Sequence, residues 1–490
     1  MKTRVLPLAA AVAMSCAMSA AHAVNVNNDG LGEVLLFPYY TAAAGNDTYI
    51  NIVNTTGEVK AVKVRFVEGM NSVEVLDFNL YLSPYDHWSG VVTSNGNGAI
   101  IKTLDKSCTV PTIPAAGQPF STALFSDDSV NGLERTKEGY VEVIEMGVVN
   151  DVDSNGTDPG DTLATDATHI NGVPKDCGAL TAAWSGGGVW LANQDHGMSY
   201  NEGGLYGYGV LINVLEGTDG TYDAVALDDF NTSDILHAAP GDSSPALADV
   251  DPSSITIIDN ATIYTGRVIP VGPSKGQDID AVSAIIMHDT IANDYVLEPT
   301  ILAGTDWVIT MPTKHDYVNQ GEDLTGDLNP ALPPFTNAWN PAKSEACEQI
   351  GITYYDREEA GQTPQGVDFS PRPPQGKFAL CAEANVLTFN QSDVLGAQTS
   401  GNLATNLDVI YNNGWMTIDF DQDGAGLTGD EHARELKTTT IGQIDGLPVI
   451  GFAIQKYVNG TLEVDGNSVL SNYAGTVTHK STRSITVSSD

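Results

Sequence analysis

Residues 48–92 read TYINIVNTTGEVKAVKVRFVEGMNSVEVLDFNLYLSPYDHWSGVV and show the clearest period-two pattern of the chain. Val62, Val64 and Phe66 alternate with charged residues. A second run follows, in which Phe78, Leu80 and Leu82 alternate with Asn79 and Tyr81. Successive side chains of a strand point to opposite faces, so each run predicts a half-buried strand. The breaks NTTGE and EGMNS contain the Asn, Gly and Ser residues that tight turns use. The stretch therefore predicts three or four antiparallel strands joined by hairpins.

Outward from this stretch, the sequence predicts a mainly β protein. We expect an antiparallel β-sandwich at 24–112, a linker or loop at 113–138, where TIPAAGQPFST is rich in Pro and small residues, and a larger β-rich region with long loops at 139–490. In that region a helix is predicted near 280–295, because Ile279, Val282 and Ile285 share a helical face. Further strands are predicted at 188–191, 205–215, 255–258, 307–311, 386–389, 415–420 and 449–455.

The first 23 residues, MKTRVLPLAAAVAMSCAMSAAHA, combine a basic start, an apolar middle and the small-x-small ending AHA. This is the pattern of a secretory signal peptide. Its apolar run is too short to span a membrane, and no later stretch approaches the required length. We therefore expect no transmembrane segment. The expected route is general secretion, to the periplasm, the cell surface or the extracellular space.

The chain is strongly acidic, with 62 Asp and Glu against 22 Lys and Arg and a net charge of −40 at pH 7. A field of this sign repels nucleic acids and anionic membranes, so nucleic acid is not an expected partner. Two explanations of the acidity stay open. The acids can cover a solvated surface adapted to salty water, or some of them can cluster as sites for hard cations.

Cysteine usage agrees with export. Once Cys16 is removed with the signal peptide, Cys108, Cys177, Cys347 and Cys381 remain. An even number in an oxidising compartment predicts two disulfides, for which three connectivities are possible. We favour the sequence-local pairing of Cys108 with Cys177 and Cys347 with Cys381, because each bridge then closes a loop-rich insertion within one half of the chain.

Residues 151–161, DVDSNGTDPGD, form the first candidate metal site. Asp151, Asp153 and Asn155 alternate so that their oxygens can converge inside a tight loop, and Asp158 or Asp161 can close the far side. Calcium takes six to eight such oxygen ligands. The opposing explanation is that Asp, Asn and Gly are simply good turn formers.

The second candidate loop follows a predicted strand, in IDFDQDGAGLTGDE. Asp419, Asp421, Asp423 and Asp430 match the ligand spacing of an EF-hand loop, with Asp in place of the usual final Glu. A strand precedes the loop where an EF-hand has a helix. We therefore expect a stand-alone calcium loop, and the shorter last carboxylate predicts weak binding.

The segments GLGEVLLFPYYT, DFNLYLSPYDHW and GLPVIGFAI, with EGYVEVIEMG, TDWVITMPTK and ITYYDREE between the last two, carry a family resemblance. Together they resemble a set of uncharacterised exported proteins of Gram-negative bacteria, over most of the mature chain. The resemblance implies export, but it implies no reaction, ligand or catalytic residue.

Enzyme motifs give little guidance. The sequence has no G-x-S-x-G elbow, no HExxH and no P-loop. A glycosidase needs only two suitably spaced carboxylates, so an enzyme stays possible, although we favour a non-enzymatic role and name no catalytic residue. Trp184, Trp190, Tyr206 and Tyr208 lie beside glycines and could form a stacking platform for carbohydrate, or could fill the core.

From the sequence we expect an exported, calcium-stabilised structural or interaction protein of the cell surface or extracellular matrix, of the surface-layer or adhesion type. Its expected partners are further copies of itself, as a homo-oligomer or lattice, or a cell-surface glycan. The alternative is a secreted carbohydrate-active enzyme or carbohydrate-binding protein.

Overall fold

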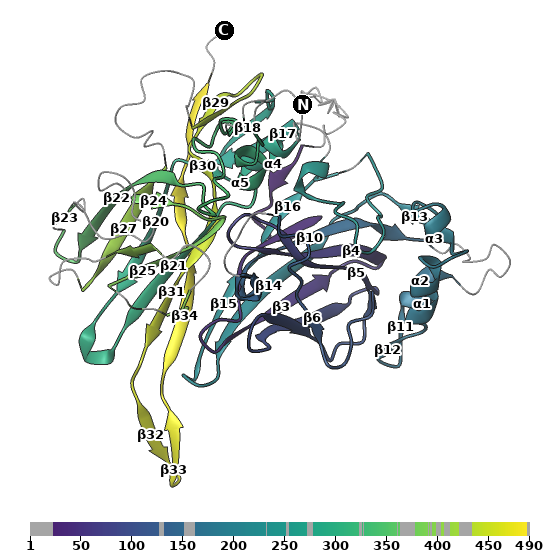
Figure 1. Cartoon of the computed structure of the whole chain (residues 1–490), viewed down its shortest axis with the longest axis horizontal. Helices are drawn as coiled ribbons and strands as arrows, with labels where there is room; N and C mark the ends of the chain where they lie inside the picture. Colours follow the sequence, from purple (N-terminus) through teal and green to yellow (C-terminus); the bar gives the residue numbers. More distant parts are fainter. Residues whose placement is uncertain are drawn as a thin grey trace, which may run out of the picture.

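The structure is a computed structural model built mostly of antiparallel strands, with few helices, as the sequence predicts (Figure 1). It describes residues 23–126, 132–150, 162–231, 233–250, 254–271, 278–322, 326, 328–359, 361–362, 378–390, 392, 394–397, 403–405, 412–420 and 434–487. The predicted signal peptide lies outside these residues except for Ala23. Two sandwiches, one from each half of the chain, make up the body.

The first sandwich consists of two sheets. Its first sheet has the order β1 (Asn25–Val26), β16 (Val225–Asp228), β2 (Val34–Thr41), β10 (Glu138–Val149), β4 (Val59–Glu68), β5 (Glu74–Leu82) and β8 (Cys108–Val110), with β13 (Met198–Ser199) pairing to β10. Its second sheet has the order β15 (Thr218–Asp223), β14 (Leu205–Asn213), β3 (Asn46–Asn54), β6 (His87–Ser94), β7 (Ala99–Lys102) and β9 (Gln118–Pro119). The inner faces enclose one apolar core, in which Trp88 is fully buried.

This sandwich extends well past the expected boundary at 113–138. β10 lies between β2 and β4 in the first sheet, and β14 pairs with β3 along its whole length. The segment 113–138 therefore connects strands of one sandwich. The composition of this segment indicates a loop, but it does not show which strands the loop connects. That depends on the pairing of β2 and β3 with strands that are distant in sequence.

The second sandwich is formed by the C-terminal half. Its third sheet has the order β23 (Gly361–Gln362), β22 (Glu348–Asp356), β27 (Asn413–Asp419), β20 (Thr290–Val296) and β35 (Lys480–Thr482), with β24 (Phe378–Leu380) pairing to β22. Its fourth sheet has the order β26 (Leu403–Thr405), β25 (Ala384–Phe389), β21 (Gly304–Thr310), β31 (Ile450–Tyr457) and β34 (Tyr473–Thr478). Both sheets contribute to one large apolar cluster.

Short sheets and helices surround the sandwiches. The small sheets pair β11 (His169–Ile170) with β12 (Val173–Pro174), β17 (Ser254–Asp259) with β18 (Thr262–Arg267), β19 (Met287–His288) with β30 (Leu447–Pro448), β32 (Thr461–Val464) with β33 (Asn467–Leu470), and β28 (Glu435–Lys437) with β29 (Gly442–Asp445) and β36 (Ser484–Val487). The helices are α1 (Leu163–Ala167), α2 (Cys177–Ala183), α3 (Val189–Ala192), α4 (Ile279–Ile285) and α5 (Lys314–Val318), with 3₁₀ turns η1 (Gly132–Lys137), η2 (Leu247–Asp249) and η3 (Pro299–Ile301). Among the described residues, no helix is long and apolar enough to cross a membrane.

Two predicted elements differ from the structure. The helix expected near 280–295 ends at Ile285, and the rest of the segment forms β19 and β20. In β20, Ile291 and Tyr295 are buried on one face, so the period-two pattern prevails there. The strand expected at 188–191 is instead the short helix α3, because four apolar residues cannot distinguish a strand from a helix.

The fourth sheet joins the two halves because both of its faces are buried. Trp307 packs in the second sandwich, and its neighbour Val308 packs in the core of the first. On that outer face, the Phe452 ring stacks on Tyr222 of β15 at 4.6 Å between centroids. The halves therefore share a continuous apolar contact.

The outer face of the first sheet is covered as well, and it contains charges. Lys60 donates to Glu145 at 2.7 Å, and both side chains are fully buried. Lys63 pairs with Asp77 at 2.8 Å and also donates to two backbone carbonyls of the segment 239–242, which crosses this face. The sequence predicts half-buried strands here; the crossing segments bury the second face.

Candidate functional site

The most protruding feature of the described chain is a hairpin arm, defined here as residues 460–471, which extends away from the body (Figure 1). It consists of β32 and β33, joined by a two-residue turn of Asp465 and Gly466. Both turn residues have positive φ, 50° and 80°, as a type I′ turn requires. The arm continues from β31 and β34, which pair with each other up to Tyr457 opposite Tyr473.

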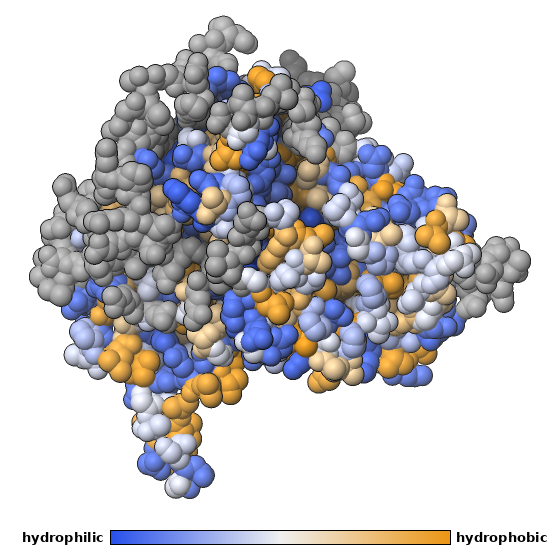
Figure 2. Space-filling view, in the orientation of Figure 1, coloured by the Kyte–Doolittle hydropathy of each residue, from blue (hydrophilic) through white to orange (hydrophobic). Residues whose placement is uncertain are grey.

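One face of the arm is apolar and faces solvent. Leu462 lies directly opposite Val469, and Val464 follows on the same face, with 56%, 47% and 51% of their surfaces exposed. Asn467, opposite Val464, shares this face. The other face carries Thr461, Glu463 and Ser468, with Leu470 at the base of the arm, against Gly217. Figure 2 shows hydrophobic surface along the arm and on the adjoining body. The arm is therefore an amphipathic two-stranded ribbon whose apolar face has no cover within the described chain.

The base of the arm is fixed to the first sandwich. Lys456 forms a 2.7 Å ion pair with Glu216, and Asn472 donates to the Glu216 carbonyl at 2.7 Å. Leu470 packs against Gly217, where a Cβ would lie 3.0 Å from the leucine side chain. These contacts hold the arm at a defined angle to the body while its tip stays free.

Most of the predicted calcium ligands lie outside the part of the chain that the structure describes. The first loop, with Asp151, Asp153, Asn155, Asp158 and Asp161, lies outside the described residues, as do Asp421, Asp423 and Asp430 of the second.

Asp419 is described, at the end of β27, opposite Thr290 and Gly351. Burial, and then the negative charges of Asp419 and Asp445, raise the pKa of Asp289. The second predicted loop therefore starts beside other carboxylates.

Both predicted disulfides are present. Cys108 is bonded to Cys177, which ties α2 to β8, and Cys347 is bonded to Cys381. Within the described ranges, Glu345 groups with Cys347 and Cys381 at distances that a metal ion could bridge. Because the two sulfurs are bonded to each other, this group has no thiolate and offers a metal one carboxylate.

The aromatic residues proposed as a platform divide into two groups. Trp190 is fully buried and stacks on Tyr81, and Trp184 donates to the Tyr81 hydroxyl at 2.8 Å. These tryptophans fill a core beneath the short helices.

The tyrosines of the same set face outward. Tyr206 and Tyr208 lie on the solvent face of β14, and Tyr49 lies on the same face of the neighbouring β3. The four predicted residues therefore do not form one row, but the two tyrosines and Tyr49 share an open sheet face.

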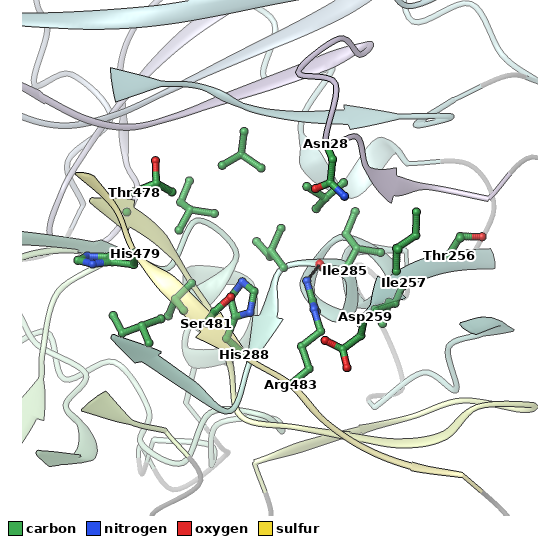
Figure 3. A pocket seen from close by; sticks show the side chains of 18 residues that line it. Asn28, Thr256, Ile257, Asp259, Ile285, His288, Thr478, His479, Ser481 and Arg483 are labelled. Carbon is green, nitrogen blue, oxygen red and sulfur yellow. Dashed lines mark hydrogen bonds between the residues drawn. The ribbon is translucent and has the colours of Figure 1, made fainter. Parts of the chain in front are cut away.

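A pocket of about 340 Å³ lies where the two halves meet (Figure 3). Its polar lining includes His288, His479 and Arg483, and its apolar lining includes isoleucines of α4 and β17. No local pattern in the sequence connects these residues, because His479 and Arg483 follow His288 and the isoleucines by more than 190 positions. The arm, by contrast, has a local signal, because Asp465-Gly466 between alternating apolar residues is a strong hairpin signature.

Comparisons of the chain with protein-family models, with curated proteins and with solved structures found no match.

Proposed function

We propose that this chain is a non-enzymatic, exported interaction protein of the cell surface or extracellular matrix, which associates with further copies of itself through the hairpin arm. The observation that carries the proposal is the exposed apolar face of Leu462, Val464 and Val469 on a ribbon with two free edges. A two-stranded hairpin is marginally stable alone in water. A partner that covers this face would stabilise the arm and remove apolar surface from solvent.

The arm has few of the features by which exposed strand edges avoid pairing. Residues 461–470, TLEVDGNSVL, contain no Lys, Arg or Pro, Glu463 is the one charged residue on the two strands, and in the described structure β32 and β33 pair with each other alone. Natural proteins protect free edges with charges, above all Lys, with Pro or with bulges. A ribbon with so little protection and one mainly apolar face is self-complementary, so two arms can meet face to face about a two-fold axis. This favours a second copy as the occupant.

The charge of the chain sets a condition on association. Two copies, each with a net charge of −40, repel each other at long range. Salt screens this repulsion over about 8 Å at physiological ionic strength. Bound calcium would reduce it further and would stabilise the acidic loops by mass action. Association should therefore increase with salt and with calcium.

Light scattering on a sizing column tests the arm. We expect the purified protein to elute as an oligomer at high salt and to shift toward monomer at low salt. The double variant Leu462→Ser/Val469→Ser should remain monomeric in both. Leu104→Ser is the matched control, because Leu104 is 93% exposed and lies away from the arm. A monomeric wild-type protein at high salt, or a variant that assembles as well as wild type, would refute the proposal.

Calcium binding is tested separately, by thermal melting with calcium and with chelator. We expect calcium to raise the melting temperature of the wild-type protein. The change of Asp421→Asn with Asp423→Asn should remove that part of the shift which the second loop provides, and Asp151→Asn with Asp153→Asn tests the first loop in the same way. A calcium-induced shift that both double variants retain in full would exclude these loops as its source.

Carbohydrate binding is a second candidate function, which the tyrosine face supports. Tyr49 and Tyr206 are 40% and 38% exposed, and Asn51 and His87 lie beside them on the same sheet face. Aromatic rings with adjacent polar groups suit the stacking of sugar rings. Affinity electrophoresis through gels that contain soluble polysaccharides would detect such binding. Retardation that persists in Tyr49→Ala/Tyr206→Ala would show that this face is not responsible.

A further inference from the structure

A lysine, a glutamate and an asparagine meet in the interior of the C-terminal half. Lys314 begins α5, Glu383 lies in the short connection between β24 and β25, and Asn385 lies in β25 opposite Ile309. All three side chains are fully buried. Burial of such polar groups costs free energy unless each one is hydrogen-bonded or paired.

Lys314 has an incomplete set of partners. Its Nζ donates to the Ala382 carbonyl at 3.1 Å, which is its one hydrogen bond within the described residues, and no described carboxylate lies within 4.0 Å of it. An ammonium group carries three donors. Burial lowers the pKa of Lys314, although the charges of Glu383 and Glu348 oppose this shift. Burial thus favours the neutral amine, which is the nucleophilic form of lysine.

The carboxylates that act on Lys314, other than Glu383, have cations of their own. Glu348 pairs with Arg434 at 3.2 Å and also accepts hydrogen bonds from a neighbouring loop. Glu345 lies 3.6 Å from the nitrogen of a largely exposed lysine. Neither of them is therefore free to neutralise Lys314.

Glu383 is the carboxyl group without a partner. Both of its oxygens are enclosed and make no hydrogen bond in the described chain. The Ser72 hydroxyl lies nearby, outside hydrogen-bonding geometry, and it accepts from the Tyr140 hydroxyl at 2.7 Å. Burial raises the pKa of Glu383 well above its usual value, although the charge of Lys314 opposes this shift. Burial therefore favours a protonated Glu383 near a neutral Lys314 amine.

Asn385 presents its carboxamide group at the carbonyl that Lys314 also contacts. Its Nδ2 donates to the Ala382 carbonyl at 2.7 Å, and its Oδ1 accepts from the Ala382 amide at 3.1 Å, so the side chain has a fixed orientation. The Lys314 Nζ bonds to the same carbonyl oxygen. Because the two nitrogens share one acceptor, the amine is held close to the carboxamide. Such enforced proximity greatly favours a reaction between two groups.

We propose that Lys314 and Asn385 form an intramolecular isopeptide bond. The neutral Nζ of Lys314 attacks Cγ of Asn385, the bond between Cγ and Nδ2 breaks, and ammonia leaves. The attacking nitrogen gives one proton to Glu383, whose own proton passes to the leaving nitrogen. The Glu383 carboxyl group ends as it began. The products are one amide and one molecule of ammonia, and the reaction requires no oxidant.

The product suits its surroundings better than the reactants do. The new amide nitrogen carries a single N–H, which the Ala382 carbonyl can accept, and the buried amine with unused donors is gone. The bond joins α5 to β25 of the fourth sheet, in which β21 connects β25 to β31. The arm continues from β31. The bond therefore braces the sheet from which the arm extends, and its formation does not depend on self-association.

Mass spectrometry of the intact, reduced protein tests this proposal. We expect the wild-type chain to weigh about 17 Da less than its sequence from the observed N-terminus, because one ammonia molecule is lost. Proteolysis should release a branched peptide that joins Lys314 to Asn385. A mass equal to that of the sequence would overturn the proposal. A loss of about 18 Da, with the branch at Glu383, would also overturn it, because a carboxyl acceptor loses water.

Two variants and one internal control assign the roles. Lys314→Met removes the nucleophile, and Glu383→Gln removes the proton carrier with little change in volume, so both should show the full sequence mass. Branching at the wild-type level in Glu383→Gln would overturn the role of Glu383. Lys60 is the control, because it is equally buried but its Nζ pairs with Glu145 at 2.7 Å. Its peptides should be linear, and branching there would contradict the selectivity for Lys314.

Discussion

The outer face of the first sheet buries charged side chains, whereas the hairpin arm exposes apolar ones. The sheet buries Lys60 and Lys63 and half-buries Arg65, and each has an acidic partner within 3 Å. The arm exposes Leu462 and Val469, and the described chain provides nothing to cover them. The sheet is complete within one chain, whereas the arm is incomplete, and this difference is why we assign interaction to the arm.

The largest effect is expected where the buried charges lose a partner. Lys60→Met leaves the Glu145 carboxylate enclosed without its cation, which should lower the free energy of unfolding by about 3–5 kcal/mol. The double variant Lys60→Met/Glu145→Leu should recover much of this loss. Urea unfolding measures both. Lys343→Met, which breaks a pair with a largely exposed lysine, is the control and should cost about 1 kcal/mol or less. A single variant as stable as this control would contradict the buried-pair interpretation.

The next effect concerns the helices that cover one end of the same sheet. The Cys108–Cys177 bridge closes a loop of 69 residues. Its removal in Cys108→Ala/Cys177→Ala should lower the free energy of unfolding by about 4 kcal/mol, chiefly by freeing the unfolded chain. Denaturant unfolding without reductant measures the change. The reduced wild-type protein gives a comparison for the combined loss of both bridges, and a double variant with unchanged stability would indicate that packing alone holds α2.

A pH dependence should follow from Glu33, which lies close to Glu145 under the covered face. Burial raises the pKa of Glu33 to about 8, against 4.5 when exposed. Between these values the folded chain retains a proton that the unfolded chain loses, so stability should fall as the pH rises through this window. Glu33→Gln should remove this slope and increase the free energy of unfolding at pH 8 by about 3 kcal/mol.

Buried histidines limit stability on the acidic side. Burial lowers the pKa of His237 and of His479 to about 4, from 6.5 when exposed. Below pH 6.5 the unfolded chain takes up protons that the folded chain excludes, so stability should fall as the pH drops toward 4. Melting temperatures across this range should therefore pass through a maximum between about pH 6 and 7, by the same linkage. A maximum that Glu33→Gln does not displace toward higher pH would contradict the role of Glu33.

The smallest effect is expected in the arm. In the monomer, Leu462→Ser/Val469→Ser removes apolar groups that are already in water, so the free energy of unfolding should change by about 0.5 kcal/mol or less. Denaturation at low salt, where association is weak, measures this. A large loss of stability would indicate that the arm packs within its own chain, and it would remove the contrast with the sheet.

Local patterns predicted local structure well. Alternation located β3 to β6 and, among the later strands, β14, β17, β21, β25, β27 and β31, and the cysteine pairs were predicted correctly from their spacing and number. The helix predicted near 280–295 is present in the first half of that range, where Ile279, Val282 and Ile285 form an apolar face.

Features that depend on distant contacts could not be predicted. The alternating pattern predicts that the Lys63 side chain faces solvent. No local signal reveals that residues 239–242 cross over it. The pocket joins Asn28 to Arg483, and its residues become a group only when both sandwiches are formed. The arm was missed for a different reason, since its Asp465-Gly466 turn is a local signal that can be read in the sequence.

The last described strands have a consequence for the order in which the molecule can be completed. β35 pairs with β20, and Thr482 bonds to Thr290, from which it is separated by 192 positions in the sequence, while β34 borders β31 in the fourth sheet. A chain synthesised from its N-terminus thus has the β20 edge of the third sheet open from residue 296 until β35 begins at residue 480. At synthesis rates of about 5–20 residues per second, that interval lasts on the order of ten seconds or more, during which the unpaired edge is accessible to other chains. Completion of the second sandwich is therefore timed by β34 and β35, and a truncation before residue 473 should yield aggregated material instead of a smaller soluble protein.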